Sequence, residues 1–329
     1  MKHVSMRLGH VVFLAVLLIA GCRSDSKAKP RVGVVPKGAN HIFWQAVHAG
    51  AMKAAREFNL EIEWNAPALE IDASRQIGIV ESMTNRKLAG IVLAPVDRKA
   101  LVNAVERAMN NGVPVAIFDS DIDTDKRISY VATDNREGGR MAARHLGELM
   151  LEKGKAAYVG FMPGSAATME REQGFYEEMA AKYPAIKIVQ KVYGKASQAT
   201  AMTAVENILT AHPDLTGMFA DNESSSMGAS LALKARSETR VRVVAFDANE
   251  QLIADLRHRH LDGLLVQDPL RMGYEATRAI ALTLRNETPP KHVDSGIVLV
   301  TRADLERPEV IPLLFPDIKK YLGSSVANK

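Results

Sequence analysis

The chain has 329 residues, and its 42 Lys and Arg residues against 38 Asp and Glu residues give a formal net charge of +4. This small excess, together with the lack of any run of Lys or Arg interleaved with aromatic residues, argues against a nucleic-acid partner. The 307 residues that follow residue 22 (329 minus 22) are enough for two domains.

The start of the chain has the pattern of a secretory signal. Lys2 and Arg7 are basic, no acidic residue precedes Asp25, and residues 11–20 form an apolar run. A membrane-spanning helix needs roughly 20 apolar residues, so this run is too short to be one. The basic start, the short apolar core and the small residues after it predict a signal peptide at residues 1–21. We therefore expect the protein in the periplasm or on the exterior of the cell envelope.

Cys22 is the only cysteine of the chain and directly follows the predicted signal. The run Ile19-Ala20-Gly21-Cys22 resembles a bacterial lipobox, in which the thiol is diacylated and the signal is cut just before it. The alternative is a free cysteine at the end of an ordinary signal peptide, although exported proteins seldom carry an odd free thiol. We expect a lipid anchor at Cys22 and a polar tether at residues 22–30, which have nothing to bury.

Short apolar runs then alternate with segments of helical periodicity. The expected strands are residues 32–35, 62–64, 90–94, 113–118, 128–132, 156–161, 186–192, 216–220, 241–246 and 264–266. The expected helices are residues 41–58, 72–86, 98–111, 135–152, 198–211 and 269–286. Several strand runs are continuously apolar, which is typical of strands buried on both faces. The alternation predicts an α/β protein with two doubly wound, Rossmann-like lobes.

The last stretch, residues 302–322, carries three prolines and cannot form one helix. We expect it to wrap the second lobe as short turns.

Polar residues follow four of the predicted strands. Asp119, Asn222, Asp247 and Gln267 all lie at or just beyond strand ends. In open α/β sheets a ligand lies beyond the carboxyl ends of the strands. Asp and Asn are also common there simply because turns begin at these positions, so the argument depends on how many converge. Together they supply the acceptors and donors that vicinal hydroxyls need.

Aromatic and basic residues complete the candidate site. Phe43 and Trp44 are adjacent rings at the first strand–helix junction, where they could stack on a sugar ring or pack in the core. Arg171 lies on an expected helix, and its guanidinium could bind ring and hydroxyl oxygens, balance an aspartate of the cleft, or remain solvated beside Glu172. His41 could contact the ligand or only begin a helix.

Several short motifs, taken together and in this order, are similar to those of a known family. They are the aromatic pair at 43–44, Ile117-Phe118-Asp119, Ala132-Thr133-Asp134-Asn135, Arg171-x-x-Gly174-Phe175, the run 210–214, Phe219-Ala220-Asp221-Asn222, Ala245-Phe246-Asp247 and Gln267. From about residue 31 to about residue 300 the chain resembles the ribose/galactose type of periplasmic sugar-binding protein, the type I solute-binding protein of ABC transporters, in its lipoprotein form.

The resemblance implies three hinge crossings between the lobes, near Thr133-Asp134, near Gln267 and near Asp294-Ser295. The first lobe would then comprise residues 30–133 and 267–294, and the second residues 134–266 and 295–329. Hinge closure would bury the ligand and create a docking surface for the permease. The family's ligand contacts fall on His41, Phe43, Trp44, Asp119, Arg171, Asn222, Asp247 and Gln267.

Four positions depart from the pattern of ribose binders. Ala94 replaces an Asn, Ser120 replaces an Arg, His41 replaces an amide, and Ala196 stands where a second-lobe aromatic residue is expected. The loss of large contacts indicates a ligand bulkier than ribose, such as a hexose, a polyol, a furanose form or a nucleoside-like sugar.

The function implied by the resemblance is capture of a small polar ligand, a monosaccharide or related polyol, and its delivery to an ABC permease of the inner membrane. We expect a monomer with no cofactor, no metal and no enzymatic activity, attached to the membrane only through its lipid. One alternative is a periplasmic sensor that presents the bound sugar to a chemoreceptor or sensor kinase. A remote alternative is an enzyme acting on glycosides, with Asp119 and Asp247 as acid and base.

Overall fold

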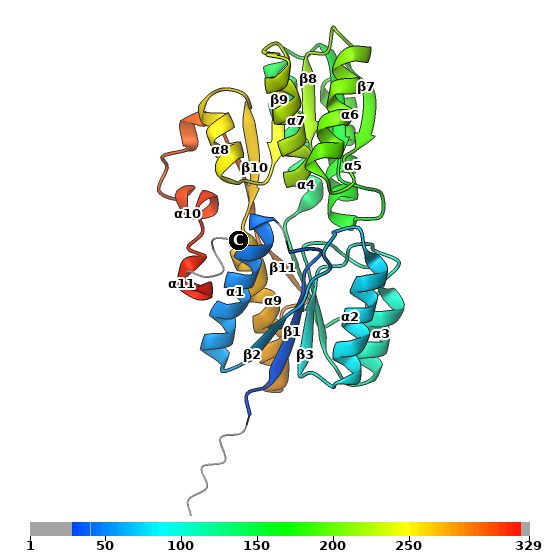
Figure 1. Ribbon diagram of the computed structural model, residues 1–329, viewed down its shortest axis with the longest axis vertical. Helices are drawn as coiled ribbons and strands as arrows, with labels where there is room; N and C mark the ends of the chain where they lie inside the picture. Colours follow the sequence, from blue (N-terminus) through cyan, green and yellow to red (C-terminus); the bar gives the residue numbers. More distant parts are fainter. Residues whose placement is uncertain (1–27, 40, 324–329) are drawn as a thin grey trace, which may run out of the picture.

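The computed structural model describes residues 28–39 and 41–323 (Figure 1). The predicted signal peptide at residues 1–21 and the predicted lipidation site, Cys22, lie outside the described residues, as does most of the tether. Within the described part, two α/β lobes are stacked along the long axis of the molecule.

The first lobe is built on a sheet with the strand order β11-β5-β4-β3-β1-β2, in which every pair is parallel. The strands are β1 (Arg31–Val35), β2 (Glu61–Trp64), β3 (Gly90–Leu93), β4 (Val115–Phe118), β5 (Ser129–Ala132) and β11 (His292–Asp294). The helices of this lobe are α1 (Ile42–Phe58), α2 (Ala73–Asn85), α3 (Val102–Asn110) and α9 (Pro269–Leu284).

The second lobe is built on a sheet with the order β12-β10-β9-β8-β6-β7, parallel except for the β10–β12 pair. The strands are β6 (Gly154–Gly160), β7 (Ile186–Tyr193), β8 (Gly217–Ala220), β9 (Arg242–Phe246), β10 (Gly263–Gln267) and β12 (Ile297–Val300). The helices are α4 (Asn135–Leu149), α5 (Ala166–Lys182), α6 (Gln198–Ala211), α7 (Glu223–Ala235) and α8 (Glu250–Arg257).

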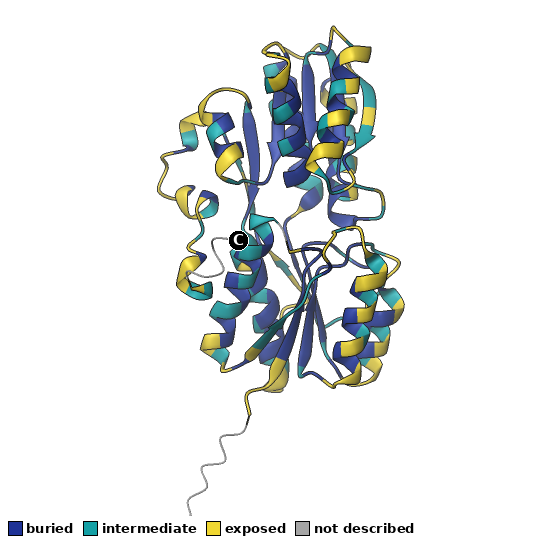
Figure 2. Ribbon diagram, viewed as in Figure 1, coloured by how far each residue is buried: buried dark blue, intermediate teal, exposed yellow. Residues whose placement is uncertain are grey.

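Both sheets are covered by helices on both faces, as the continuous apolar runs predict. The central strands β3, β4 and β8 are buried along their whole length. Figure 2 shows the strands dark throughout the interior, while exposed residues line the outer faces of the helices. The predicted fold class is therefore confirmed. Strands β11 and β12 were not predicted, because each has only three or four residues and a single turn separates them.

The chain passes between the sheets at three places among the described residues: after β5 at residues 133–134, after β10 at Asp268, and between β11 and β12 at residues 295–296. Two of these segments are bonded to each other. The Thr133 hydroxyl lies 3.3 Å from the Ser295 hydroxyl and donates to the Gly296 carbonyl at 3.2 Å. The connections at 133–134 and 295–296 therefore lie side by side.

The C-terminal segment consists of η1 (Arg302–Asp304), α10 (Ile311–Leu314) and α11 (Lys319–Leu322), in that order. Leu305, Val310 and Leu314 pack into the second-lobe core, as expected. The expectation that all of residues 295–329 belong to the second lobe is wrong for α11. Ile318 packs against Ala46 and Ala49 of α1 in the first lobe, where small side chains leave an apolar surface for it.

Candidate functional site

A small cavity of about 40 Å³ lies between the two lobes, where the strands of both sheets end. We call it the polar cavity. Its lining residues are Lys37, His41, Phe43, Trp44, Glu70, Asp119, Phe161, Ala167, Thr168, Arg171, Asn222, Glu223, Asp247 and Gln267. The eight residues that the sequence singles out are all among them. Their role as ligand contacts stays a prediction.

Asp119 and Asp247 occupy matching places in the two lobes. Asp119 follows β4 and Asp247 follows β9, and their φ angles are 61° and 69°. In each case the backbone N–H donates to the neighbouring strand, from Asp119 to the Val131 carbonyl at 3.0 Å and from Asp247 to the Leu265 carbonyl at 2.8 Å. Asp tolerates this left-handed conformation better than most residues. The two strand ends therefore turn both carboxylates into the space between the lobes.

Arg171 is positioned by the close packing of α4 on α5. A Cβ atom on Gly139 would lie 2.0 Å from the Arg171 carbonyl oxygen, so the two helices approach to backbone contact there. The buried guanidinium donates from Nε to Asn135 Oδ1 at 2.8 Å and from Nη1 to the Asp221 carbonyl at 2.7 Å. It also lies over the Phe246 ring, 3.6 Å from the ring centroid. Arg171 is thus fixed by its own lobe rather than solvated.

Asp247 is held from two sides. Its Oδ1 accepts a hydrogen bond from Gln267 Nε2 at 2.7 Å, and its Oδ2 accepts one from the Glu223 backbone N–H at 3.0 Å. Burial raises the pKa of Asp247, while the positive charge of Arg171 opposes that rise. Asn222 caps α7, because its Oδ1 accepts from the Ser225 N–H at 3.2 Å.

Burial strongly raises the pKa values of two further carboxyl groups beside the cavity. Burial raises the pKa of Asp221 to about 7, although a hydrogen bond from the Tyr158 hydroxyl at 2.8 Å acts in the opposite direction. Burial likewise raises the pKa of Glu223 to about 7. The second-lobe side of the cavity therefore contains carboxyl groups that change charge near neutral pH.

Phe43 and Trp44 lie edge to face, with ring centroids 4.8 Å apart. Trp44 is buried, packs in the first-lobe core and donates from Nε1 to Glu70 Oε1 at 2.5 Å. His41 Nδ1 lies 3.3 Å from Glu70 Oε1 and 3.9 Å from Glu223 Oε2. The imidazole therefore lies between one carboxylate of its own lobe and one of the other lobe.

Lys37 is the main lining residue that the sequence reasoning missed. Its ammonium lies 2.7 Å from Asp119 Oδ2 and donates to Ser120 Oγ at 2.7 Å and to Ser165 Oγ at 3.2 Å. Lys37 follows the last residue of β1 by two positions. Its place at a strand end could have indicated a site residue, but only acidic and amide residues were considered at the strand ends. The ammonium lies beside Ser120, which is the position where ribose binders place an arginine.

Three direct contacts join the lobes across the cavity. Lys37 reaches Ser165, the Ala167 N–H donates to Ser120 Oγ at 3.2 Å, and the Arg98 N–H donates to the Gly164 carbonyl at 3.0 Å. These bonds tie the strand-end loops of the first lobe to the loop that begins α5. The structure therefore represents a closed arrangement of the lobes.

The other departures from the ribose pattern have less to do with the cavity. Ala94 is fully buried, and its carbonyl accepts from Gln76 Nε2 at 2.8 Å. Neither Ala94 nor Ala196 is part of the cavity lining. Among the described residues, no group of three or more His, Cys, Asp or Glu side chains is arranged to hold a metal ion.

Comparison with known proteins identifies the architecture. The sequence model of the periplasmic binding protein domain matches residues 32–288. The chain belongs to the periplasmic binding protein family. The predicted resemblance is thereby confirmed, and the two-lobed fold described above is the one that the family shares with this chain.

Two named relatives match most of this chain. The ribose import binding protein of Bacillus subtilis (strain 168) is 27% identical over 303 residues, which are 89% of this chain and 97% of the relative. The D-apiose import binding protein of Actinobacillus succinogenes is 29% identical over 220 residues, 67% of this chain and 70% of the relative.

Solved structures of solute-binding proteins also have the same fold as this chain. A carbohydrate transporter solute-binding protein from Agrobacterium radiobacter, in complex with D-arabinose, has a TM-score of 0.85 and 30% identity over 88% of this chain and 100% of that one. An ABC transporter solute-binding protein from Agrobacterium vitis with bound D-fucose has a TM-score of 0.84 and 31% identity over 87% and 100% of the two chains.

Membership of this family has two consequences. The protein is a binding protein rather than an enzyme, so the alternative with Asp119 and Asp247 as catalytic acid and base is set aside. Its place is extracytoplasmic, as the sequence predicts. Of the helices in residues 28–39 and 41–323, none combines the length and the apolar character needed to cross a membrane.

Proposed function

We propose that this periplasmic binding protein captures a monosaccharide or related polyol between its lobes and delivers it to an ABC permease. The observation that carries the proposal is the polar cavity itself, in which donors, acceptors and aromatic rings from both lobes converge. Sugars present vicinal hydroxyls that need both donors and acceptors, and apolar ring faces that stack on aromatic side chains. The relatives named for ribose, D-apiose, D-arabinose and D-fucose support the same ligand class.

Nine of the fourteen lining residues have a role in this proposal. Asp119 and Asp247 accept hydrogen bonds from hydroxyls, and Arg171 and Lys37 donate to hydroxyl or ring oxygens. Asn222 and Gln267 can do either through their amides, and His41 adds a hydrogen-bonding imidazole. Phe43 provides the stacking ring and Trp44 supports it, since Trp44 lies deeper in the core.

Capture requires the lobes to move. A cavity of about 40 Å³ has room for only a few water molecules, each of which needs about 10–15 Å³ of such space, so a sugar cannot enter the closed arrangement. In our proposal residues 30–132 and 269–294 form one rigid unit, and residues 135–267 together with β12 form the other. They separate by rotation about the segments at 133–134, 268 and 295–296. Closure on the sugar expels water and brings together the surface that the permease recognises.

A thermal-shift screen tests the ligand class. The protein is heated with pentoses, hexoses, polyols and nucleosides, each at about 100 times an expected dissociation constant. A ligand at that concentration adds about 2.7 kcal/mol to the free energy of unfolding. We expect a clear rise in melting temperature with one class of sugar. No rise with any sugar would move the ligand outside this class and contradict the proposal.

We also propose that the protein acts as a monomer attached to the membrane through acyl chains on Cys22. The lipobox-like run before Cys22 supports the anchor, and stable attachment takes more than one acyl chain. Palmitate labelling and detergent phase partition compare the full chain with its Cys22→Ser variant. We expect the label and the detergent-phase partition only in the parent chain. An unlabelled parent would reject the anchor and leave sugar binding untouched.

A further inference from the structure

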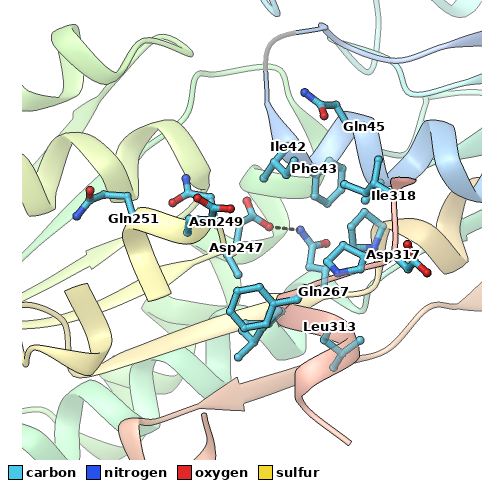
Figure 3. A pocket seen from close by; sticks show the side chains of 18 of the residues that line it. Ile42, Phe43, Gln45, Asp247, Asn249, Gln251, Gln267, Leu313, Asp317 and Ile318 are labelled. Atoms are coloured by element: carbon cyan, nitrogen blue, oxygen red, sulfur yellow. Dashed lines mark hydrogen bonds between the residues drawn. The ribbon is translucent and has the colours of Figure 1, made fainter. Parts of the chain in front are cut away.

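A second and much larger cavity lies beside the polar cavity, with a volume of about 650 Å³ (Figure 3). We call it the apolar cavity. Most of its lining is hydrophobic, including Ile42, Ala46, Met227, Val266, Leu314 and Phe315. Small-molecule sites usually measure about 300–1,000 Å³ and are lined mainly by hydrophobic side chains. By size and lining, the apolar cavity has the properties of a ligand site.

The walls of the apolar cavity come from both lobes. Ile42 and Ala46 belong to α1 of the first lobe, and Met227 to α7 of the second. The C-terminal segment forms a further wall. Its Leu314 is part of the second-lobe core, while its Ile318 packs on α1. Because the cavity is lined by both lobes, a group bound in it would contact both lobes in the closed arrangement.

The two cavities share three lining residues, Phe43, Asp247 and Gln267. Figure 3 shows Asp247 and Gln267 joined by their hydrogen bond, with Phe43 on the α1 side of the cavity. The shared wall is therefore one side-chain pair and one ring. A ligand atom attached to a sugar in the polar cavity has only these side chains between it and the apolar cavity.

An unsatisfied acceptor marks the junction. Gln267 is 3% exposed, and its Oε1 has no hydrogen-bond partner within the described part of the chain. A buried polar atom without a partner is costly, and the cost is removed when a ligand donates a hydrogen bond to it. Gln267 Oε1 thus offers an acceptor for a ligand placed where the two cavities meet.

We infer that the ligand is a sugar carrying an apolar substituent, such as an aryl or alkyl glycoside. The sugar ring occupies the polar cavity, and the substituent passes beside Phe43 and the Asp247–Gln267 pair into the apolar cavity. This inference rests on the proposed function and narrows its ligand class. The substituent loses its contact with water against the apolar part of the lining, which includes Ile42, Val266 and Phe315.

Binding of matched glycosides tests the inference. The full chain with Cys22→Ser is titrated calorimetrically with D-ribose, D-arabinose, D-allose and D-galactose, each as free sugar, methyl glycoside and phenyl glycoside in both anomers. For one sugar, we expect the phenyl glycoside to bind about ten- to a hundredfold more tightly than the methyl glycoside, as burial of an aromatic ring predicts.

Two methionine variants locate the substituent. Met227 and Met202 are both half-buried and pack against the same second-lobe core, but only Met227 lines the apolar cavity. Met227→Trp fills part of the cavity, so it should abolish the gain from the phenyl group and leave the affinity for the methyl glycoside unchanged. Met202→Trp should change neither affinity.

Three results would overturn the inference. Equal affinities for phenyl and methyl glycosides, or binding of free sugars alone, would show that the ligand carries no apolar substituent. Either result would leave the proposed sugar-binding function intact. An equal loss of both affinities in Met227→Trp would place the phenyl group elsewhere. Failure of every sugar and glycoside to bind would reject the proposed function and this inference together.

Discussion

The two walls of the polar cavity differ in what holds their side chains in place. On the second-lobe wall, Arg171 is bonded to Asn135 and to the Asp221 carbonyl, and Asp247 is bonded to the Glu223 N–H, all within one lobe. On the first-lobe wall, Lys37 depends partly on Ser165 of the other lobe. His41 likewise lies near Glu223.

This difference suggests that one wall determines sugar affinity and the other determines closure of the cleft. On the second-lobe wall, Arg171 and Asp247 keep their geometry when the lobes part, because the bonds that hold these two side chains do not cross the cleft. The first-lobe wall loses bonds on opening and regains them on closure. We therefore expect the second lobe to set the affinity for the sugar, and the first lobe to set how readily the cleft closes. The following predictions test that division, beginning with the largest expected effect.

The second-lobe wall should make stability depend on pH. Burial raises the pKa of Asp221 to about 7 from its usual value of 3.8, so the folded protein keeps a proton that the unfolded chain has lost. The contribution to stability is complete below pH about 4 and disappears as the pH rises through about 7, by on the order of 4 kcal/mol at most. Urea midpoints of the parent and of Asp221→Asn between pH 4 and 8 measure this.

Asp221→Asn should flatten that pH dependence, since an amide does not titrate. Asp214→Asn is the matched control, because Asp214 is exposed and pairs only with Lys155 at the surface. Identical slopes in all three proteins would show that Asp221 does not keep its proton in the folded protein near neutral pH.

Asp247→Asn should reduce sugar affinity at least tenfold. Asn tolerates the positive φ of this position, but it loses one of the two acceptors that bind Gln267 and the Glu223 N–H, and it brings a second donor to them. A lost partner in a desolvated site costs about 1–3 kcal/mol. Isothermal calorimetry measures the change, and Asp214→Asn should bind normally. Unchanged affinity would remove Asp247 from the site.

Lys37→Met should act mainly on closure. The variant loses the bond to Ser165 across the cleft and leaves Asp119 without its cation, so the closed form becomes less favourable. We expect affinity to fall severalfold and small-angle scattering to report a larger radius of gyration. Lys187→Met, on the exposed face of β7, is the control. A fall in affinity with no change in radius would assign Lys37 to ligand contact alone.

Ser165→Ala should produce the smallest change. It removes one hydrogen-bond partner of Lys37 while the bonds to Asp119 and Ser120 remain. A single neutral partner of this kind is worth about 0.5–1.5 kcal/mol, so affinity should fall between about twofold and tenfold. A loss as large as that of Asp247→Asn would break the division between the two walls.

The sequence was sufficient for the two lobes and for eight of the fourteen positions that line the cavity, because most of these depend on local signals. Continuous apolar runs mark buried strands, and Asp119 and Asp247 follow such runs directly. Arg171 was a candidate from its residue type and its expected helix, but the sequence left open whether it binds the ligand, balances an aspartate or stays solvated. Its actual position depends on the backbone contact between α4 and α5 at Gly139, which no periodicity reports.

The residues that sequence reasoning missed are those whose partners are distant in the chain. Lys37 finds Asp119 and Ser165 across 82 and 128 positions, and nothing in the local pattern around Lys37 indicates either partner. Likewise α11 rests on α1 because Arg56 donates to the carbonyls of Lys320 and Tyr321, at 3.0 and 2.8 Å. Helix α11 has only four residues, so its sequence shows no periodicity that would predict its contact with α1.

The attachment of α11 to α1 also limits the motion of the hinge. Leu314 is fixed in the second-lobe core and Ile318 on the first lobe, with three residues between them. Fully extended, this link reaches at most about 14 Å between the two Cα atoms. The lobes can therefore separate widely only on the side away from the link, unless α11 detaches. The C-terminal segment would thus restrict both the direction in which the lobes open and how far they separate.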